Sequence, residues 1–186
     1  MARISLDPPR PVSYRFAEWY FRRKFGDVLE PIRAMGHSKE VMRAYGRFEQ
    51  GAGRWRRLET RISDLADMAT VARIGCSWCL DFGYWVMHNA RHLPGEDRVR
   101  ARLARGPLFN PLDRLVIEYA ERVTEAPPTV DDELVRRLLE HLDEAQLIEL
   151  TMIVRLENVR SPFTPALGIA PQGSRTAARC LILEWK

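Results

Sequence analysis

The chain of 186 residues carries a formal net charge of +4, with 46% hydrophobic, 29% charged and 9% aromatic residues and three cysteines. A chain of this length buries about 70% of its unfolded surface, so intrinsic disorder and a miniprotein held together by disulfides are both excluded. Basic residues cluster within residues 54–61 and 98–105, but acidic residues surround both clusters, and no apolar run approaches the length of a membrane span. We therefore expect a soluble cytoplasmic protein that binds neither nucleic acid nor membrane.

The first half of the chain predicts an extended arm followed by four helices. Three prolines within residues 1–13 disfavour helix and predict the arm. Apolar residues that recur every three or four positions, bounded by capping residues and glycines, predict helices over residues 14–25, 39–51, 54–74 and 76–91. Gly75 breaks the chain between the last two helices, so we expect them to fold back on each other as a hairpin.

The second half predicts further helices and no strand. Capping residues, prolines and apolar spacing place them over residues 96–104, 110–126, 131–141 and 143–159. The last of these helices carries apolar residues on more than one side, so we expect it to be largely buried. Prolines make the tail over 161–186 irregular. The fold class is therefore all-α, a single-domain helical bundle over residues 14–160.

Cys76 and Cys79 form the most informative motif. Two residues separate them, and the pair follows directly after Gly75, in the first turn of a predicted helix. Unpaired N–H groups and the helix dipole stabilise a thiolate there, and a second cysteine three residues away closes a disulfide with little rearrangement. The pair is thus a candidate two-electron redox switch, with two buried small hydrophobic residues as the alternative. A zinc site lacks its other two ligands, so we expect no metal.

This region resembles the carboxymuconolactone decarboxylase and alkylhydroperoxidase D-like family. The resemblance covers about residues 35–165 and rests on Asp64, twelve residues before Cys76, on the CxxC with the following Leu-Asp-Phe, on the helix start at 110–113 and on the helix over 144–160. It implies an alkylhydroperoxidase D-like bundle with the CxxC at the N-terminus of a central helix. It also implies a homo-oligomer, either a trimer or a hexamer.

The resemblance also implies roles for individual residues. Redox-active members of the family use a glutamate, two cysteines and a histidine four residues after the second cysteine. By this pattern Cys79 attacks the hydroperoxide, Cys76 resolves the product as a disulfide, and Asp64 occupies the glutamate position. Gly83 stands where the histidine is expected, which interrupts the proton path from the carboxylate to the thiol. A water molecule beside Gly83, or Tyr84, is a candidate bridge.

Other chemically notable residues have simpler explanations. His88 and His92 are expected to be cations near a helix C-terminus rather than metal ligands, and Cys180 to be a bystander. Asp67 and Asp81 are expected to be solvated at the surface. Four aromatic residues follow the cysteines and are expected to pack in the core, with the wall of an apolar pocket as the alternative: Trp78, Phe82, Tyr84 and Trp85.

The predicted function is a thiol-dependent peroxidase or disulfide oxidoreductase of the antioxidant type. It would need no cofactor, act on a small hydroperoxide or disulfide, and take electrons from a thiol donor. Two alternatives stay open. One is a cofactor-free decarboxylase or isomerase of a lactone-type acid, although decarboxylase members of the family generally lack the cysteine pair. The other is a non-catalytic helical scaffold, which the missing histidine at Gly83 favours.

Overall fold

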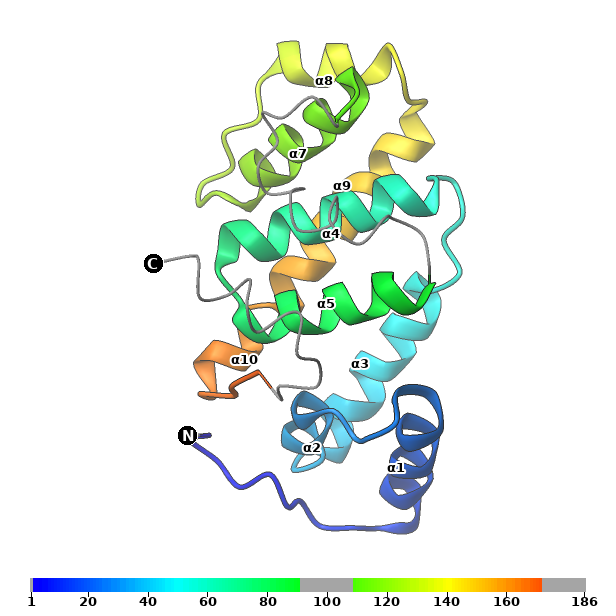
Figure 1. Ribbon diagram of the computed structural model, residues 1–186, viewed down its shortest axis with the longest axis vertical. Helices are drawn as coiled ribbons and strands as arrows, with labels where there is room; N and C mark the ends of the chain where they lie inside the picture. Colours follow the sequence, from blue (N-terminus) through cyan, green and yellow to red (C-terminus); the bar gives the residue numbers. More distant parts are fainter. Residues whose placement is uncertain (1, 91–108, 172–186) are drawn as a thin grey trace. The chain divides into compact units, whose positions relative to one another are not determined.

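The computed structural model describes residues 2–90 and 109–171, and these residues form helices, turns and loops without a strand. The all-α fold class predicted from the sequence is confirmed. The described residues divide into two compact units: the N-terminal unit, residues 2–55 with 163–171, and the core unit, residues 56–90 with 109–162. None of the described helices combines the length and the apolar character that a membrane span requires. Figure 1 shows the helices of both units.

The N-terminal unit contains two helices that the sequence predicted and two shorter ones that it did not. Its helices are α1 (Val12–Phe25), α2 (Glu30–Met35), α3 (Lys39–Ala52) and α10 (Phe163–Ala166). Ser38 caps α3 as predicted, because its side chain accepts the N–H of Val41. The helix α2 has a proline in its first turn, Pro31, which is buried. The single turn of α10 falls in the tail that was expected to be irregular.

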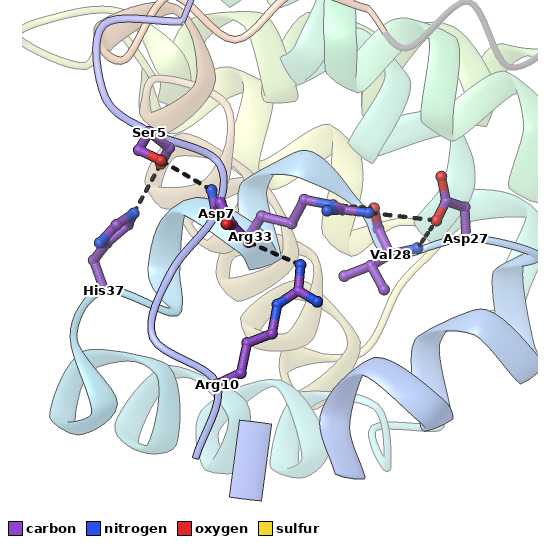
Figure 2. A network of polar contacts seen from close by, with 7 residues as sticks. All are labelled: Ser5, Asp7, Arg10, Asp27, Val28, Arg33 and His37. Carbon is purple, nitrogen blue, oxygen red and sulfur yellow. Dashed lines mark hydrogen bonds and ion pairs between the residues drawn. The ribbon is translucent and has the colours of Figure 1, made fainter. Parts of the chain in front are cut away.

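The segment before α1 takes part in the packing of the N-terminal unit. The N–H of Arg3 donates to the carbonyl oxygen of Leu167 at 2.8 Å. The Nε2 atom of His37 lies 2.8 Å from the carbonyl oxygen of Ser5, and Figure 2 shows this bond within a network of polar contacts. A Cβ atom at Gly36 would lie only 2.7 Å from a ring carbon of Pro8. These contacts tie the arm to the loop before α3 and to the residue that follows α10.

The core unit holds the main hydrophobic core. Its helices are α4 (Thr60–Ile74), α5 (Ser77–Ala90), α7 (Pro111–Thr124), α8 (Asp132–Leu139) and α9 (Glu144–Arg160). The helices α4, α7 and α9 pack against one another, α8 lies against α7 and α9, and α5 folds back on α4 (Figure 1). The predicted cap at Asn110 is confirmed, and Asp131 and Asp143, expected at helix starts for their favourable charge, also act as caps. Each of the three side chains accepts a backbone N–H three residues further on. These caps and the apolar faces define the bundle.

The helix expected from residue 54 begins later, at Thr60. The buried carboxylate of Glu149 on α9 accepts the N–H groups of Arg57 and Leu58 at 2.9 and 3.2 Å. The amide of Gln146 also donates to the carbonyl oxygen of Arg57 at 3.1 Å. The backbone of this segment therefore bonds to α9 instead of continuing the helix. The charged helix predicted over 96–104 lies outside the described residues.

Candidate active site

The candidate site lies at the turn between α4 and α5. Gly75 ends α4 with a φ of 80°, a left-handed conformation that favours glycine, and its N–H donates to the carbonyl oxygen of Val71 at 2.9 Å. Cys76 follows, with its N–H 3.3 Å from the same oxygen, and α5 begins at Ser77. The hairpin predicted from Gly75 is thus present, and the cysteine pair occupies the turn and the first turn of α5.

Cys76 and Cys79 are joined by a disulfide, and their Cα atoms are 5.3 Å apart. Both residues are buried, Cys76 with 1% and Cys79 with 8% of its surface exposed. The backbone N–H of Cys79 donates to the Sγ atom of Cys76 at 3.2 Å. The sulfur therefore takes the place of the oxygen that an N-cap side chain usually supplies. When the disulfide opens, this N–H and the helix dipole stabilise a thiolate on Cys76.

Gly83 packs directly against α4. A Cβ atom built at Gly83 would lie 2.8 Å from the Sδ atom of Met68, closer than real Cβ contacts come. The thioether of Met68 therefore fills the space where a histidine side chain would begin. Sequence reasoning missed this contact, because it depends on how α4 and α5 are aligned.

Asp64 lies on α4 one turn before Met68, and its Oδ2 atom is buried. The contact between Met68 and Gly83 fixes the alignment of the hairpin. On α4, Asp64 lies four residues further from the turn than Met68. On α5, Cys79 lies four residues nearer to the turn than Gly83. At about 1.5 Å per residue, Asp64 and Cys79 are about 12 Å apart along the helix axes. The structure thus joins the two cysteines and places Asp64 beyond direct contact with Cys79.

Three aromatic rings stack along one side of α5. The ring centroids of Trp78 and Phe82 are 5.1 Å apart, and those of Phe82 and Trp85 are 6.1 Å apart. The residues are spaced by four and three positions and so share one helix face. Trp78 is buried, while Phe82 and Trp85 are half-buried. The stack begins beside Cys79, and the side chain of Tyr84 lies outside what the structure describes.

Asp81 is buried, with 4% of its surface exposed, so the expectation that it is solvated is wrong. Asp67 is half-buried, and its Oδ1 atom is buried. A signal for Asp81 was present in the sequence, because it is the only charged residue between Cys76 and Met87. Buried carboxylates are rare in proteins, so Asp81 is a residue of this helix whose substitution is worth testing.

The remaining candidate residues, the histidines and Cys180, lie away from the cysteine pair or outside the described residues. The side chain of His88 is not described, and His92 and Cys180 lie outside the described residues. His37 belongs to the N-terminal unit, and His141 is exposed after α8. Over residues 2–90 and 109–171, no group of three or more His, Cys, Asp or Glu side chains is arranged to hold a metal ion.

Comparisons with known proteins identify a relative and the fold. No family model matches the chain. The chain is 33% identical over 169 residues to the uncharacterized protein YnjA of Escherichia coli (strain K12), and the match covers 88% of this chain and 90% of YnjA. An identity of this level over nearly all of both chains shows common family membership.

Two solved structures are similar over almost their whole length. The debrominase Bmp8, in a cysteine-to-alanine variant in complex with 2,3,4-tribromopyrrole, has a TM-score of 0.82 at 16% identity, with 100% of both chains covered. The alkylhydroperoxidase AhpD core of an uncharacterized peroxidase-related protein from Ralstonia eutropha JMP134 has a TM-score of 0.79 at 16% identity, with 92% of this chain and 93% of that chain covered. The fold implied by the resemblance is thus confirmed, and the chain belongs to the family of YnjA and has the alkylhydroperoxidase D-like fold.

Proposed function

We propose that the chain is a thiol-dependent oxidoreductase that cycles Cys76 and Cys79 between a dithiol and a disulfide. The observation that carries the proposal is the pair itself, bonded at the start of α5 with the N–H of Cys79 directed at the Sγ atom of Cys76. The likeness to peroxidase-related structures supports an enzyme of the antioxidant type. Such a cycle requires a compartment that regenerates thiols, which we take to be the cytoplasm.

The environment of the two sulfurs suggests different roles. The N–H of the first turn points to Cys76, so this hydrogen bond stabilises a thiolate on Cys76 in the reduced protein. Cys79 is the more exposed of the two, with 8% against 1%. We therefore assign Cys79 as the sulfur that meets the substrate and Cys76 as the sulfur that resolves the intermediate.

With a hydroperoxide, the proposed reaction has two steps on the protein. The thiolate of Cys79 attacks the terminal oxygen of the hydroperoxide. The S–O bond forms and the O–O bond breaks, so an alcohol leaves after protonation and Cys79 becomes a sulfenic acid. The thiolate of Cys76 then attacks the Sγ atom of Cys79. The disulfide forms, the S–O bond breaks, and the departing hydroxide takes a proton to become water.

Reduction by a dithiol donor closes the cycle. A donor thiolate attacks the Sγ atom of Cys79 and forms a mixed disulfide, while Cys76 leaves as the stabilised thiolate. The second donor thiol then displaces Cys79 and becomes the donor's own disulfide. The better leaving group is the thiol of lower pKa, so the bond at Cys76 favours this direction of opening.

The contact between Met68 and Gly83 favours a slow peroxidase. A thioether is a weak acceptor and carries no proton, so it cannot connect Asp64 to Cys79. General acid–base assistance is typically worth about 100-fold to 10,000-fold. Disulfide exchange depends less on such a relay than peroxide reduction does, so a disulfide is the second substrate class that we propose for the pair.

The test is steady-state reduction of cumene hydroperoxide with dithiothreitol as the electron donor. We expect the Cys79→Ser variant to fall to the uncatalysed rate, and the Cys76→Ser variant to accumulate a sulfenic acid that dimedone traps. Cys180→Ser is the matched control and should keep the activity of the unchanged chain. Unchanged activity in Cys79→Ser would refute the proposal. Turnover of a lactone-type acid without either cysteine would support a decarboxylase or isomerase instead.

A second candidate function is the reductive removal of a halide from an aromatic ring. The observation that favours it is the ring stack of α5, because flat aromatic ligands bind well against stacked rings. The structural similarity to a debrominase points in the same direction. The dithiol would supply two electrons: the aryl–bromine bond is replaced by a bond to hydrogen, bromide and a proton are released, and the cysteines become the disulfide. Bromide release from 2,3,4-tribromopyrrole, lost in Cys79→Ser, tests this candidate.

A further inference from the structure

The helix α1 presents aromatic side chains to solvent. Phe16, Trp19 and Tyr20 expose 67%, 56% and 46% of their surface. Residues three and four positions apart share one side of a helix, so Trp19 and Tyr20 both lie next to Phe16. The rings of Phe16 and Trp19 pack against each other, with their centroids 5.6 Å apart. The three residues form one apolar ridge, which we call the α1 ridge.

The opposite side of α1 supplies the packing of the helix within the N-terminal unit. Tyr14 is buried there, and Phe21 and Phe25 are half-buried with their ring centroids 5.8 Å apart. The α1 ridge is therefore not needed for the fold of its own unit. Large apolar side chains that gather on an exposed surface are typical of a contact site.

Arginines border the α1 ridge. Arg15, Arg22 and Arg23 are exposed, and none of the ion pairs within residues 2–90 and 109–171 includes them. Glu18, the one acidic residue in the sequence of α1, is half-buried. The exposed charges beside the ridge are therefore positive, and they are available to a negatively charged partner.

The positive charge of the chain is concentrated in the same unit. Residues 2–55 contain eleven basic and six acidic residues, a formal net charge of +5, while the whole chain carries +4. Two of these acidic residues, Asp7 and Asp27, pair with Arg10 and Arg33, which lie outside α1 (Figure 2). The N-terminal unit is thus positive around the α1 ridge, and the rest of the chain is close to neutral.

An aromatic ridge bordered by arginines matches the surface of an anionic membrane. Tryptophan and tyrosine rings favour the level of the lipid headgroups, where one edge of the ring is apolar and the other is wet. Arginine can lay its aliphatic part along the apolar boundary and direct its guanidinium group to the phosphates. Nucleic acid matches the charge less specifically, because bases stack on open ring faces and Phe16 and Trp19 already pack against each other.

We propose that α1 attaches this protein to the surface of an anionic phospholipid bilayer, with the α1 ridge among the headgroups and the arginines at the phosphates. The expectation of a protein that binds no membrane rested on the lack of a spanning segment, and a helix that lies on the surface does not need one. The inference does not depend on the proposed redox function, because α1 and the cysteine pair belong to different units.

The test is cosedimentation of the full chain with vesicles, either of phosphatidylcholine alone or of one part phosphatidylglycerol to two parts phosphatidylcholine. We expect binding to the anionic vesicles, and release at about 0.5 M salt, where charges are screened beyond about 4 Å. Arg22→Gln/Arg23→Gln should bind about 25-fold more weakly, because each arginine near an anionic surface contributes about fivefold. Trp19→Ala/Tyr20→Ala should no longer sediment, because the ridge is lost.

Matched control variants lie on α8 of the core unit. Arg136→Gln/Arg137→Gln removes two neighbouring exposed arginines and changes the net charge by the same amount, and it should bind as the unchanged chain does. Leu139→Ala shortens an apolar side chain with 41% exposure and should also bind normally. Far-ultraviolet circular dichroism of every variant checks that its helices are folded.

Four results would overturn the proposal. The first is no binding to the anionic vesicles, or equal binding to phosphatidylcholine alone. The second is equal weakening in the arginine variants of α1 and α8, since the net charge would then be responsible. The third is a lower mass of Trp19→Ala/Tyr20→Ala in light scattering without lipid, which would mean that another copy of the chain covers the ridge. The fourth is displacement of the chain from vesicles by a single-stranded oligonucleotide that the same α1 variants fail to bind, which would assign the ridge to nucleic acid.

Discussion

At the scale of single residues, the contact between Met68 and Gly83 bears most directly on the proposed chemistry. Because a Cβ atom at Gly83 would lie 2.8 Å from the Sδ atom of Met68, a larger residue at position 83 requires the Met68 side chain to move. The family pattern has a histidine there, which would link Asp64 to the thiol. In this chain, the proposed proton transfer to and from Cys79 therefore lacks the carrier that the family pattern supplies.

This contact predicts how the relay can be restored. Gly83→His alone should gain little peroxidase activity, because the new side chain collides with Met68. The double variant Met68→Ala/Gly83→His has room for the imidazole between the level of Asp64 and that of Cys79. We expect its second-order rate constant for cumene hydroperoxide to rise about 100-fold, the low end of the range for general acid–base assistance. Stopped-flow oxidation of the dithiol measures it.

Met68→Ala alone is the control for the cavity that the substitution creates. It should leave the rate constant near that of the unchanged chain, because it adds space and no proton carrier. A double variant that is no faster than this control would contradict the relay interpretation of position 83.

The sequence was enough to find the cysteine pair, since Gly75 and the CxxC are neighbours in the chain and act through local backbone geometry. It was not enough to place Asp81 or Met68. Whether a side chain on α5 faces solvent or α4 depends on the rotation of one helix against the other, and this rotation is set by packing over the whole core unit.

At the scale of elements, one ion pair joins α4 to α7. The guanidinium of Arg61 donates two hydrogen bonds to the carboxylate of Asp113, at 2.6 and 2.5 Å. Asp113 is completely buried and also accepts the N–H of Asn110 in the capping box of α7. The hydrogen bonds to Asp113 raise the pKa of Arg61 above its usual value. The pair thus fixes the start of α7 against α4.

Removal of Arg61 should cost more stability than neutralisation of Asp113. Arg61→Ala leaves a buried carboxylate without its cation, and we expect the free energy of unfolding to fall by about 3 kcal/mol. Asp113→Asn keeps an oxygen for the cap and leaves an arginine that can turn to solvent, so we expect a loss of about 1 kcal/mol. Urea unfolding followed by circular dichroism measures both values.

Arg136→Ala is the matched control, because Arg136 pairs with Glu133 and Glu140 on the exposed side of α8. Exposed ion pairs add little to stability, so no measurable change is expected. The reverse order, with Asp113→Asn the more damaging of the two core variants, would contradict the argument from burial.

The helix boundaries also divide into those set by local contacts, which the sequence can predict, and those set by distant contacts. The caps at Ser38, Asn110 and Asp143 could be predicted, because each cap bonds to an N–H three residues away. The start of α4 could not, because it is set by Glu149, about ninety positions further along the chain. The short helices α2 and α10 are too brief to show an apolar period.

At the scale of the whole molecule, the two units differ in how much they bury. The core unit contains the extended cluster of buried apolar residues on α4, α7 and α9. In the N-terminal unit, α3 has no buried residue, and the buried side chains are few, with Tyr14 the largest. Burial raises the pKa of the Tyr14 phenol. Apolar burial dominates folding free energy, so stability is unevenly distributed along the chain.

Hydrogen exchange should report this difference directly. We expect amides of α3 to exchange about 100-fold faster than those of α4, α7 and α9, because opening α3 exposes little apolar surface. Mass spectrometry after pepsin digestion resolves the two groups of peptides. Equal protection of α3 and α4 would mean that α3 is covered by a surface that its own unit does not supply.

Met68, the methionine beside Gly83, also limits the exposure to peroxide that the hairpin of α4 and α5 can tolerate. A thioether exposed to peroxide gains an oxygen and becomes a polar sulfoxide. The Sδ atom of Met68 lies beside Gly83 of α5, so an oxygen added on that side requires the Met68 side chain to move. We therefore expect oxidation of Met68 to disturb the packing of α5 on α4 near the turn that holds the cysteines. The time for which the protein keeps its function under oxidative stress would then depend on reduction of the Met68 sulfoxide, although Met68 takes no part in the proposed reaction.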